Sequence, residues 1–152
     1  MNQQTNLFGK KEEMIFMAEK TYNNGIRNFI WTYLVELAKK SKKGYCYYSD
    51  VVHKVYGKYQ ISLPNEIGYL LGPIMEYCDD NNLPPLTSLV VNKKYRIPGK
   101  GLITCEISNQ NELEKVHKRV FAYKWDKIQN PFAKYDLKNL GKKRSVHLQR
   151  KK

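Results

Sequence analysis

The chain has 152 residues, of which 41% are apolar and 27% charged, and its 27 lysines and arginines against 14 acids give a net charge of +13. A chain of this length and composition builds a core without disulfide or metal staples, so one globular domain is expected. A positive surplus of this size favours polyanionic partners such as DNA, RNA or an acidic protein face.

Three cysteines, Cys46, Cys78 and Cys105, occur at wide spacing. Their odd number argues against a disulfide framework and favours a reducing compartment, so we expect a cytoplasmic protein. No Cys-x-x-Cys or paired Cys/His spacing predicts a zinc site, and no metal or other cofactor is expected. Residues 1–13 lack the apolar core of a signal peptide, and no apolar run approaches the ~20 residues that cross a membrane, so no membrane partner is expected.

Composition divides the chain into three parts. Residues 1–22 form an N-terminal segment in which Lys10–Lys20 predicts a short helix with an apolar side. Residues 23–136 carry the regular apolar patterns and predict a single domain. Residues 137–152 contain seven basic residues and no acid, which is typical of a flexible basic tail.

The clearest helix follows Asn23 and Asn24, either of which can cap it with a side-chain oxygen. Its apolar residues repeat at the spacing of one buried helix face: Ile26, Phe29, Ile30, Tyr33, Leu34 and Leu37. Gly44 stands where a left-handed C-terminal stop is expected. Four lysines fill the last turn and the exit: Lys39, Lys40, Lys42 and Lys43. They complement the negative helix end or contact phosphates, and the two roles are compatible.

Two elements with turn signals come next. Tyr45–Tyr48 predicts a short strand, and Ser49 is expected to cap a helix over Asp50–Tyr56 that Gly57 ends.

A second strong helix is predicted over Pro64–Asp80. Ser62 can cap it, and Pro64 is tolerated in the first turn because its missing N–H has no helical partner there. Its buried stripe comprises Ile67, Leu70, Leu71, Ile74, Met75 and Cys78. Gly72-Pro73 in the middle predicts a kink or a break. No lysine or arginine occurs from Tyr59 to Asn92, where the acids are Glu66, Glu76, Asp79 and Asp80.

A basic β-hairpin is predicted after this helix. Thr87–Val91 and Leu102–Ile107 are its strands, and Lys93–Lys100 is its turn. Asn111 then caps a last helix that Pro131 stops. The apolar residues of that helix are Leu113, Val116, Val120, Phe121, Trp125 and Ile128, although Val120–Trp125 is also compatible with a strand.

Taken in order, these elements predict an α+β fold. Its core is a winged helix-turn-helix of three helices plus a β-hairpin wing, with extra N- and C-terminal helical segments and a basic tail. Domains of this class bind DNA with the third helix in the major groove and with phosphates at the wing and the helix starts.

Three segments also resemble the C-terminal winged-helix domain of the DNA alkyltransferase and alkyltransferase-like family. They are Tyr48 to Val52, Asn65 to Gly72, and Pro85–Val91 with Pro98-Gly99. The family's active strand reads Pro-Cys-His-Arg-Val-Val, whereas this strand reads Pro-Leu-Thr-Ser-Leu-Val-Val. The acceptor cysteine, the histidine and the arginine are missing, so the resemblance implies the shape of a DNA-binding domain without alkyl transfer.

These observations predict a non-catalytic nucleic-acid-binding protein, with double-stranded DNA favoured over RNA and phosphates held by the wing and the tail. Asn65 and Tyr69, at the start of the third helix, are the expected base-proximal residues. No catalytic residue is expected, because the histidines stand apart from any nucleophile and no phosphate loop or hydrolase motif occurs. The full set of candidate nucleic-acid-binding residues is Lys39, Lys40, Lys42, Lys43, Lys54, Lys58, Asn65, Tyr69, Lys93, Lys94, Arg96, Lys100, Lys142, Lys143 and Arg144.

The acidic residues of the third helix favour a second class of function. Four carboxylates, those of Glu66, Glu76, Asp79 and Asp80, repel phosphates, so this helix is expected to turn away from nucleic acid or to bind a protein partner. The alternative is therefore a small basic interaction or inhibitor protein. A phage or mobile-element accessory that opposes host defence by binding a nucleoprotein complex is one example.

Overall fold

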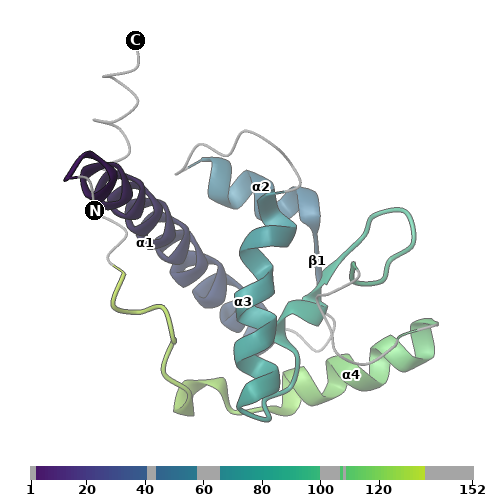
Figure 1. Cartoon of the computed structure of the whole chain (residues 1–152). Helices are drawn as coiled ribbons and strands as arrows, with labels where there is room; N and C mark the ends of the chain where they lie inside the picture. The colour runs from purple at the N-terminus through teal and green to yellow at the C-terminus, as the bar shows by residue number, and fades with distance from the viewer. Residues whose placement is uncertain (1–2, 41–43, 58–65, 100–106, 108, 136–152) are drawn as a thin grey trace.

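The computed structural model describes residues 3–40, 44–57, 66–99, 107 and 109–135 (Figure 1). Its elements in chain order are α1 Gln3–Lys40, β1 Cys46–Tyr47, α2 Tyr48–Tyr56, α3 Glu66–Asp80, the 3₁₀ turn η1 Leu86–Leu89, β2 Val90–Val91, α4 Gln110–Ala122 and the 3₁₀ turn η2 Trp125–Lys127. The described chain is therefore mostly helical with one small sheet, which agrees with the predicted α+β class. The predicted tail at 137–152 lies outside the described residues.

The first helix is longer than predicted. We expected a short helix over Lys10–Lys20 and a second helix capped by Asn23 or Asn24, but α1 runs without interruption through both asparagines. Asn24 is buried, and its side-chain oxygen accepts a hydrogen bond from Arg27 Nη1 at 2.8 Å, so it does not cap a helix start. An asparagine is a strong cap only where the chain enters a helix, and here the preceding residues are already helical.

The capping of α2 differs from the prediction as well. The strand predicted at Tyr45–Tyr48 is confirmed at Cys46–Tyr47, but Tyr48 is already the first residue of α2. The carboxylate of Asp50, not the hydroxyl of Ser49, serves the helix start by accepting the Tyr47 N–H at 2.9 Å. An acid in the first turn that reaches back to the cap residue is the usual reciprocal half of a capping box.

Helix α3 passes through Pro73 without a break, so of the two outcomes predicted at Gly72-Pro73, a kink or a break, the break does not occur. Proline has no N–H, so the carbonyl of Tyr69, four residues earlier, loses its helical donor. Arg27 of α1 donates from Nη2 to this carbonyl at 3.3 Å and from Nε to the Leu70 carbonyl at 2.9 Å. The guanidinium group thus replaces the missing donor, which explains why the helix continues.

The end of α3 follows the prediction and is well defined. Asn82 adopts a left-handed backbone with φ of 56°, and the N–H of Leu83 donates to the Cys78 carbonyl at 2.8 Å. The N–H of Asn82 donates to the Asp79 carbonyl at 3.2 Å. This pair of bonds is a Schellman motif, which satisfies the last carbonyls of the helix and turns the chain towards the sheet.

The strand predicted at Thr87–Val91 is only half correct. Leu86–Leu89 forms the turn η1, with all four residues buried, and only Val90–Val91 is a strand. Short apolar runs are ambiguous from sequence, and the i, i+3 spacing of Leu86 and Leu89 lets both enter the core from one turn.

The sheet pairing also departs from the predicted hairpin. Strand β2 lies parallel to β1, with Cys46 opposite Val90 and Tyr47 opposite Val91. Parallel neighbours require a crossover, which α2 and α3 provide. Of the predicted partner strand Leu102–Ile107, only Ile107 is described, and it is not in a strand.

Helix α4 begins one residue before the predicted cap. Asn109, not Asn111, accepts the Glu112 N–H through its side chain at 2.9 Å. The predicted buried stripe of Leu113, Val116 and Val120 is confirmed. Trp125 lies beyond the helix in η2, where its indole N–H donates to the Val120 carbonyl at 2.8 Å.

The core lies where α1, α2, α3 and η1 meet. Figure 1 shows α3 at the centre of the molecule, with α1 crossing beside it and α4 below the sheet. The predicted stripes supply the fully buried side chains of this core, among them Ile26, Ile30, Leu34, Ile67, Leu70, Leu71 and Ile74. The first half of α1 extends away from this core in the same view, and its Met14, Ile15 and Met17 are exposed.

Candidate nucleic-acid interface

Three exposed cations, Lys93, Lys94 and Arg96, gather in the turn Asn92–Ile97, which we call the basic turn. Asn92 closes it with both its backbone and its side chain. The Asn92 N–H donates to the Ile97 carbonyl at 2.8 Å, and the Asn92 carbonyl accepts the Arg96 N–H at 2.7 Å. The side-chain oxygen of Asn92 accepts the N–H groups of Lys94 at 2.7 Å and Tyr95 at 3.2 Å. The local chemistry is that of an Asx turn.

Contacts on both sides fix the basic turn to the fold. Gln110, the first residue of α4, donates its side-chain amide to the Arg96 carbonyl at 2.9 Å. On the other side, the Gly99 N–H donates to the hydroxyl of Tyr48 at 3.0 Å, and Pro98 is buried. Arg96 itself has a left-handed φ of 57°, a conformation that a non-glycine residue keeps only where its surroundings enforce it. The cationic side chains of the turn therefore project from a backbone that hydrogen bonds fix in place.

Tyrosines surround these cations. The Lys93 ammonium lies 6.0 Å from the ring centre of Tyr47, and the Lys94 ammonium lies 5.3 Å from that of Tyr95. Tyr45 packs edge-on against Tyr47 with ring centres 5.8 Å apart. Tyr45 raises the pKa of Tyr47, and the positive charge of Arg96 partly opposes this shift. Lysine, arginine and tyrosine side chains are thus interleaved on one surface, which is the composition of many nucleic-acid-binding surfaces.

The structure separates the predicted site residues into different environments. Lys93, Lys94 and Arg96 are exposed together on the basic turn. Lys39 pairs with Asp126 at 2.6 Å, while Lys40 is exposed at the end of α1. Lys54 is exposed on α2 with its ammonium 5.9 Å from the Tyr33 ring. The remaining predicted cations and Asn65 lie outside the described residues: Lys42, Lys43, Lys58, Lys100, Lys142, Lys143 and Arg144.

Tyr69, the predicted base-proximal residue, belongs to a different part of the molecule. Its side chain is 67% exposed, but the Arg27 guanidinium lies over its ring at 5.3 Å. The exposed side chains further along α3 are acidic, namely Glu76, Asp79 and Asp80. The predicted acidic character of this surface therefore stands for these three residues, while the Glu66 side chain is outside the description.

The described cysteines, Cys46 and Cys78, and His117 are all buried. Burial raises the pKa of the Cys46 thiol to about 12 and that of the Cys78 thiol to about 11, so neither is a thiolate near neutral pH. His117 is buried and its Nε2 lies 2.7 Å from the Ser88 carbonyl. No group of three potential metal-ligating side chains occurs within residues 3–40, 44–57, 66–99 and 109–135.

Sequence reasoning missed the aromatic part of this surface. Tyr45 and Tyr47 flank the buried Cys46, and this alternation along a short strand would have placed both tyrosines on the outer face. Tyr95 lies between Lys94 and Arg96 in the basic turn, and an aromatic residue between cations is the signal that identifies it. Gln110 has no comparable signal, since its contact with Arg96 depends on how α4 packs.

Comparison with known proteins finds no matching family model, no matching curated protein and no matching solved structure. Within the part of the chain that the structure describes, no helix combines the length and apolarity of a membrane span.

Proposed function

We propose that this chain binds nucleic acid without catalysis, with double-stranded DNA as the favoured partner, and that the basic turn holds the phosphates. The observation that carries this proposal is the arrangement of Lys93, Lys94 and Arg96. Their side chains are exposed while the backbone between them is closed by Asn92. Because the backbone is already fixed, binding restricts only the side chains of these cations, so more of their attraction to phosphates is retained.

The net charge and the neighbouring tyrosines support the same reading. A charge of +13 attracts any polyanion at long range, but it does not select a surface. The basic turn offers a local surface where phosphates meet cations and where sugars or bases meet the rings of Tyr45, Tyr47 and Tyr95. The acidic residues of α3 fit this proposal if that helix turns away from the phosphates.

Salt dependence tests the proposal directly. Each phosphate contact releases counterions and adds roughly 0.9 to the slope of log affinity against log salt. Replacing Lys93, Lys94 and Arg96 together with alanine is therefore expected to reduce the slope by about 2 to 3 and to weaken duplex binding at low salt by at least roughly tenfold. Fluorescence anisotropy with a labelled duplex across a salt series measures both quantities.

A matched control separates the turn from total charge. Lys10, Lys11 and Lys20 are exposed on the outer half of α1, and their replacement with alanine removes the same charge. We expect a much smaller loss of slope in that variant. Equal losses in the two variants, or no binding at low salt, would show that the basic turn is not the phosphate-holding surface.

The interaction or inhibitor protein predicted as the alternative has its own support. Met14, Ile15 and Met17 are 71%, 61% and 52% exposed on a helix that extends beyond the core. Exposed apolar side chains close together favour a protein partner. The salt series also distinguishes the two functions. A chain that binds no duplex at low salt, while these apolar residues are exposed, fits the interaction or inhibitor protein better.

A further inference from the structure

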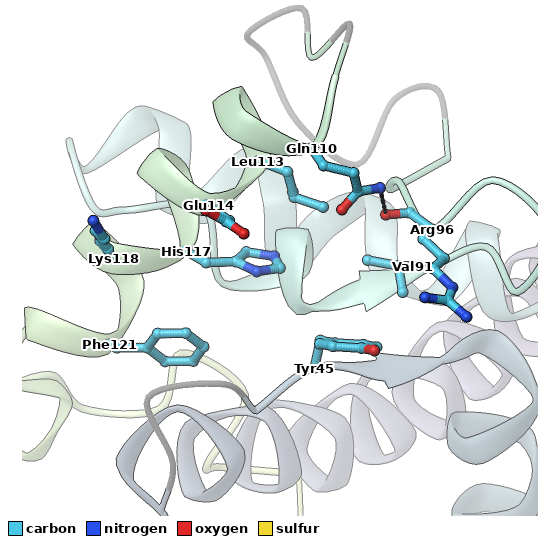
Figure 2. A pocket seen from close by; sticks show the side chains of 9 residues that line it. All are labelled: Tyr45, Val91, Arg96, Gln110, Leu113, Glu114, His117, Lys118 and Phe121. Carbon is cyan, nitrogen blue, oxygen red and sulfur yellow. Dashed lines mark hydrogen bonds between the residues drawn. The ribbon is translucent and has the colours of Figure 1, made fainter.

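A cavity of about 460 Å³ lies between α4 and the edge of the sheet, next to the basic turn (Figure 2). One continuous face of α4 lines it, because the contributing residues repeat at i, i+3, i+4, i+7, i+8 and i+11. They are Gln110, Leu113, Glu114, His117, Lys118 and Phe121. The opposite side consists of Tyr45, Val91 and Arg96. The volume lies within the range of small-molecule sites, roughly 300–1,000 Å³.

The apolar and aromatic part of the lining suits a flat ring. Leu113 and Val91 lie on opposite sides of the cavity, and the rings of Tyr45 and Phe121 stand at its lower edge in Figure 2. Tyr45 is 43% exposed, so its ring is available to a ligand. Aromatic rings contribute most to such a site when they contact another π system.

The polar part of the α4 face offers hydrogen-bond acceptors. The carboxylate of Glu114 accepts only, and Figure 2 shows it directed towards His117. The Ser88 carbonyl accepts from His117 Nε2, which therefore carries the proton and leaves Nδ1 as an acceptor in the neutral ring. Gln110 donates its amide to Arg96, which leaves its carbonyl oxygen as a third acceptor.

Two cations stand at the ends of the lining. Arg96 belongs to the basic turn, and Lys118 lies on the opposite side of the view in Figure 2. Because both signs of charge are present, the lining disfavours a ligand that is only an anion or only a cation. It fits a molecule with an anionic group at one end and a flat, donor-bearing ring at the other.

We propose that this cavity binds a single nucleotide whose base presents hydrogen-bond donors, guanine best, with its phosphate towards Arg96 or Lys118. Guanine carries adjacent ring and amino N–H groups, which pair with the two oxygens of one carboxylate, here that of Glu114. Uracil and thymine present one ring N–H and carbonyl oxygens, so the same carboxylate repels part of their edge. The nucleotide is either free or an unpaired residue of a bound strand, and the second form rests on the proposed function.

Titration of the full chain with the four mononucleotides GMP, AMP, CMP and UMP tests the proposal. Calorimetry is expected to show GMP binding at least roughly tenfold more tightly than UMP, as for a bidentate contact with a base edge. Amide shifts in NMR spectra should concentrate on Gln110–Phe121. Glu114→Gln should lower GMP affinity by roughly tenfold and leave UMP affinity unchanged, because an amide offers one acceptor instead of two.

Glu76→Gln is the matched control, since it removes one exposed carboxylate from α3. Thermal melting of both variants checks that each remains folded. GMP binding that lacks base preference, or that Glu114→Gln and Glu76→Gln change equally, overturns the cavity proposal.

A second experiment distinguishes a free nucleotide from one that belongs to a bound strand. It also tests the cavity proposal separately from the proposed nucleic-acid binding. A thymidine oligomer with one central guanosine is compared with GMP, using the chain and its Lys93→Ala/Lys94→Ala variant. Tighter binding of the oligomer that the lysine variant weakens supports a strand-borne nucleotide. Equal binding of GMP to both proteins, without duplex binding at low salt, supports a free nucleotide and refutes only the proposed function. Salt-dependent duplex binding without any GMP binding refutes only the cavity proposal.

Discussion

Two of the regions in which a cation lies near a tyrosine ring, the Arg27 junction and the basic turn, are opposite environments. The Arg27 junction is formed by Asn24, Arg27, Tyr69, Leu70 and Pro73. Arg27 is 5% exposed there, and its guanidinium donates to two carbonyls and an amide oxygen. In the basic turn, the backbone is hydrogen-bonded while the cationic side chains remain exposed.

The difference shows that proximity to a tyrosine does not define a binding cation. Burial lowers the pKa of the Arg27 guanidinium from its usual value, although hydrogen bonding and the charges of Tyr69 and Glu76 oppose the shift. The N–H groups of Arg27 that are hydrogen-bonded all donate to acceptors within the fold. The lysines of the basic turn have exposed side chains instead. Changes in the Arg27 junction should therefore alter stability, and changes in the basic turn should alter binding.

The largest effect is expected from Arg27→Met. This change removes the donors to the part-buried Tyr69 carbonyl and to the buried Leu70 carbonyl, and it should lower the free energy of unfolding by about 3 kcal/mol, measured by urea denaturation. Duplex affinity per folded molecule should stay the same. Pro73→Ala supplies the N–H that the Tyr69 carbonyl lacks, so it should stabilise the Arg27→Met background by about 1 kcal/mol more than the wild type.

The double-mutant comparison is the critical control for that junction. Identical effects of Pro73→Ala in the two backgrounds would mean that Arg27 does not replace the missing helical donor.

An intermediate effect is expected from Asn92→Ala. The N–H groups of Lys94 and Tyr95 lose their acceptor, which should cost about 1 kcal/mol of stability, as for a lost helix cap. Duplex affinity at low salt should fall several-fold because the cations are no longer held in place. The salt slope should not change, since the number of cations is the same. A reduced slope would contradict the idea that Asn92 acts through the position of the turn alone.

The smallest effect is expected where a cation is paired but exposed. Lys39 and Asp126 are 47% and 76% exposed, so their 2.6 Å contact is largely screened by solvent. Asp126→Asn should lower stability by about 0.5 kcal/mol or less in thermal melts, and the difference should vanish in about 0.5 M salt. Asp79→Asn, which alters an exposed acid on α3, serves as the control. An equal loss of stability in that variant would show that the Lys39–Asp126 ion pair contributes nothing to stability.

Sequence patterns predicted the interior better than the surface. The stripes of α1, α3 and α4 were found because burial of one helix face imposes a period that local sequence displays, as Ile26 to Leu34 and Ile67 to Cys78 illustrate. The basic turn was found because Pro98, Gly99 and a run of cations are local signals too. The uninterrupted α1 was missed because a capping asparagine and a helical asparagine look identical in sequence.

Other features depend on partners that are distant along the chain. The parallel pairing of Cys46 with Val90 follows from the path of α2 and α3 between them, and no local pattern encodes it. Pro73 predicts a kink or a break from the sequence, because the donor that replaces its missing N–H belongs to Arg27. That residue is 46 positions away in the sequence. No local pattern predicts the cavity, because the α4 face that lines it mixes apolar with polar residues, and its other side consists of Tyr45, Val91 and Arg96 from distant segments.

The sequence by itself determined which helix faces are buried, where the basic turn lies, and how strongly basic the protein is. Each of these depends on residues close together in the chain. Only the tertiary structure decided which cations are buried and hydrogen-bonded inside the fold, as Arg27 is, and which remain exposed, as Lys93 and Lys94 are. Whether a cation is buried or exposed depends on hydrogen bonds and contacts between segments that are distant in the sequence. These contacts arise only when α1, α3 and α4 pack together.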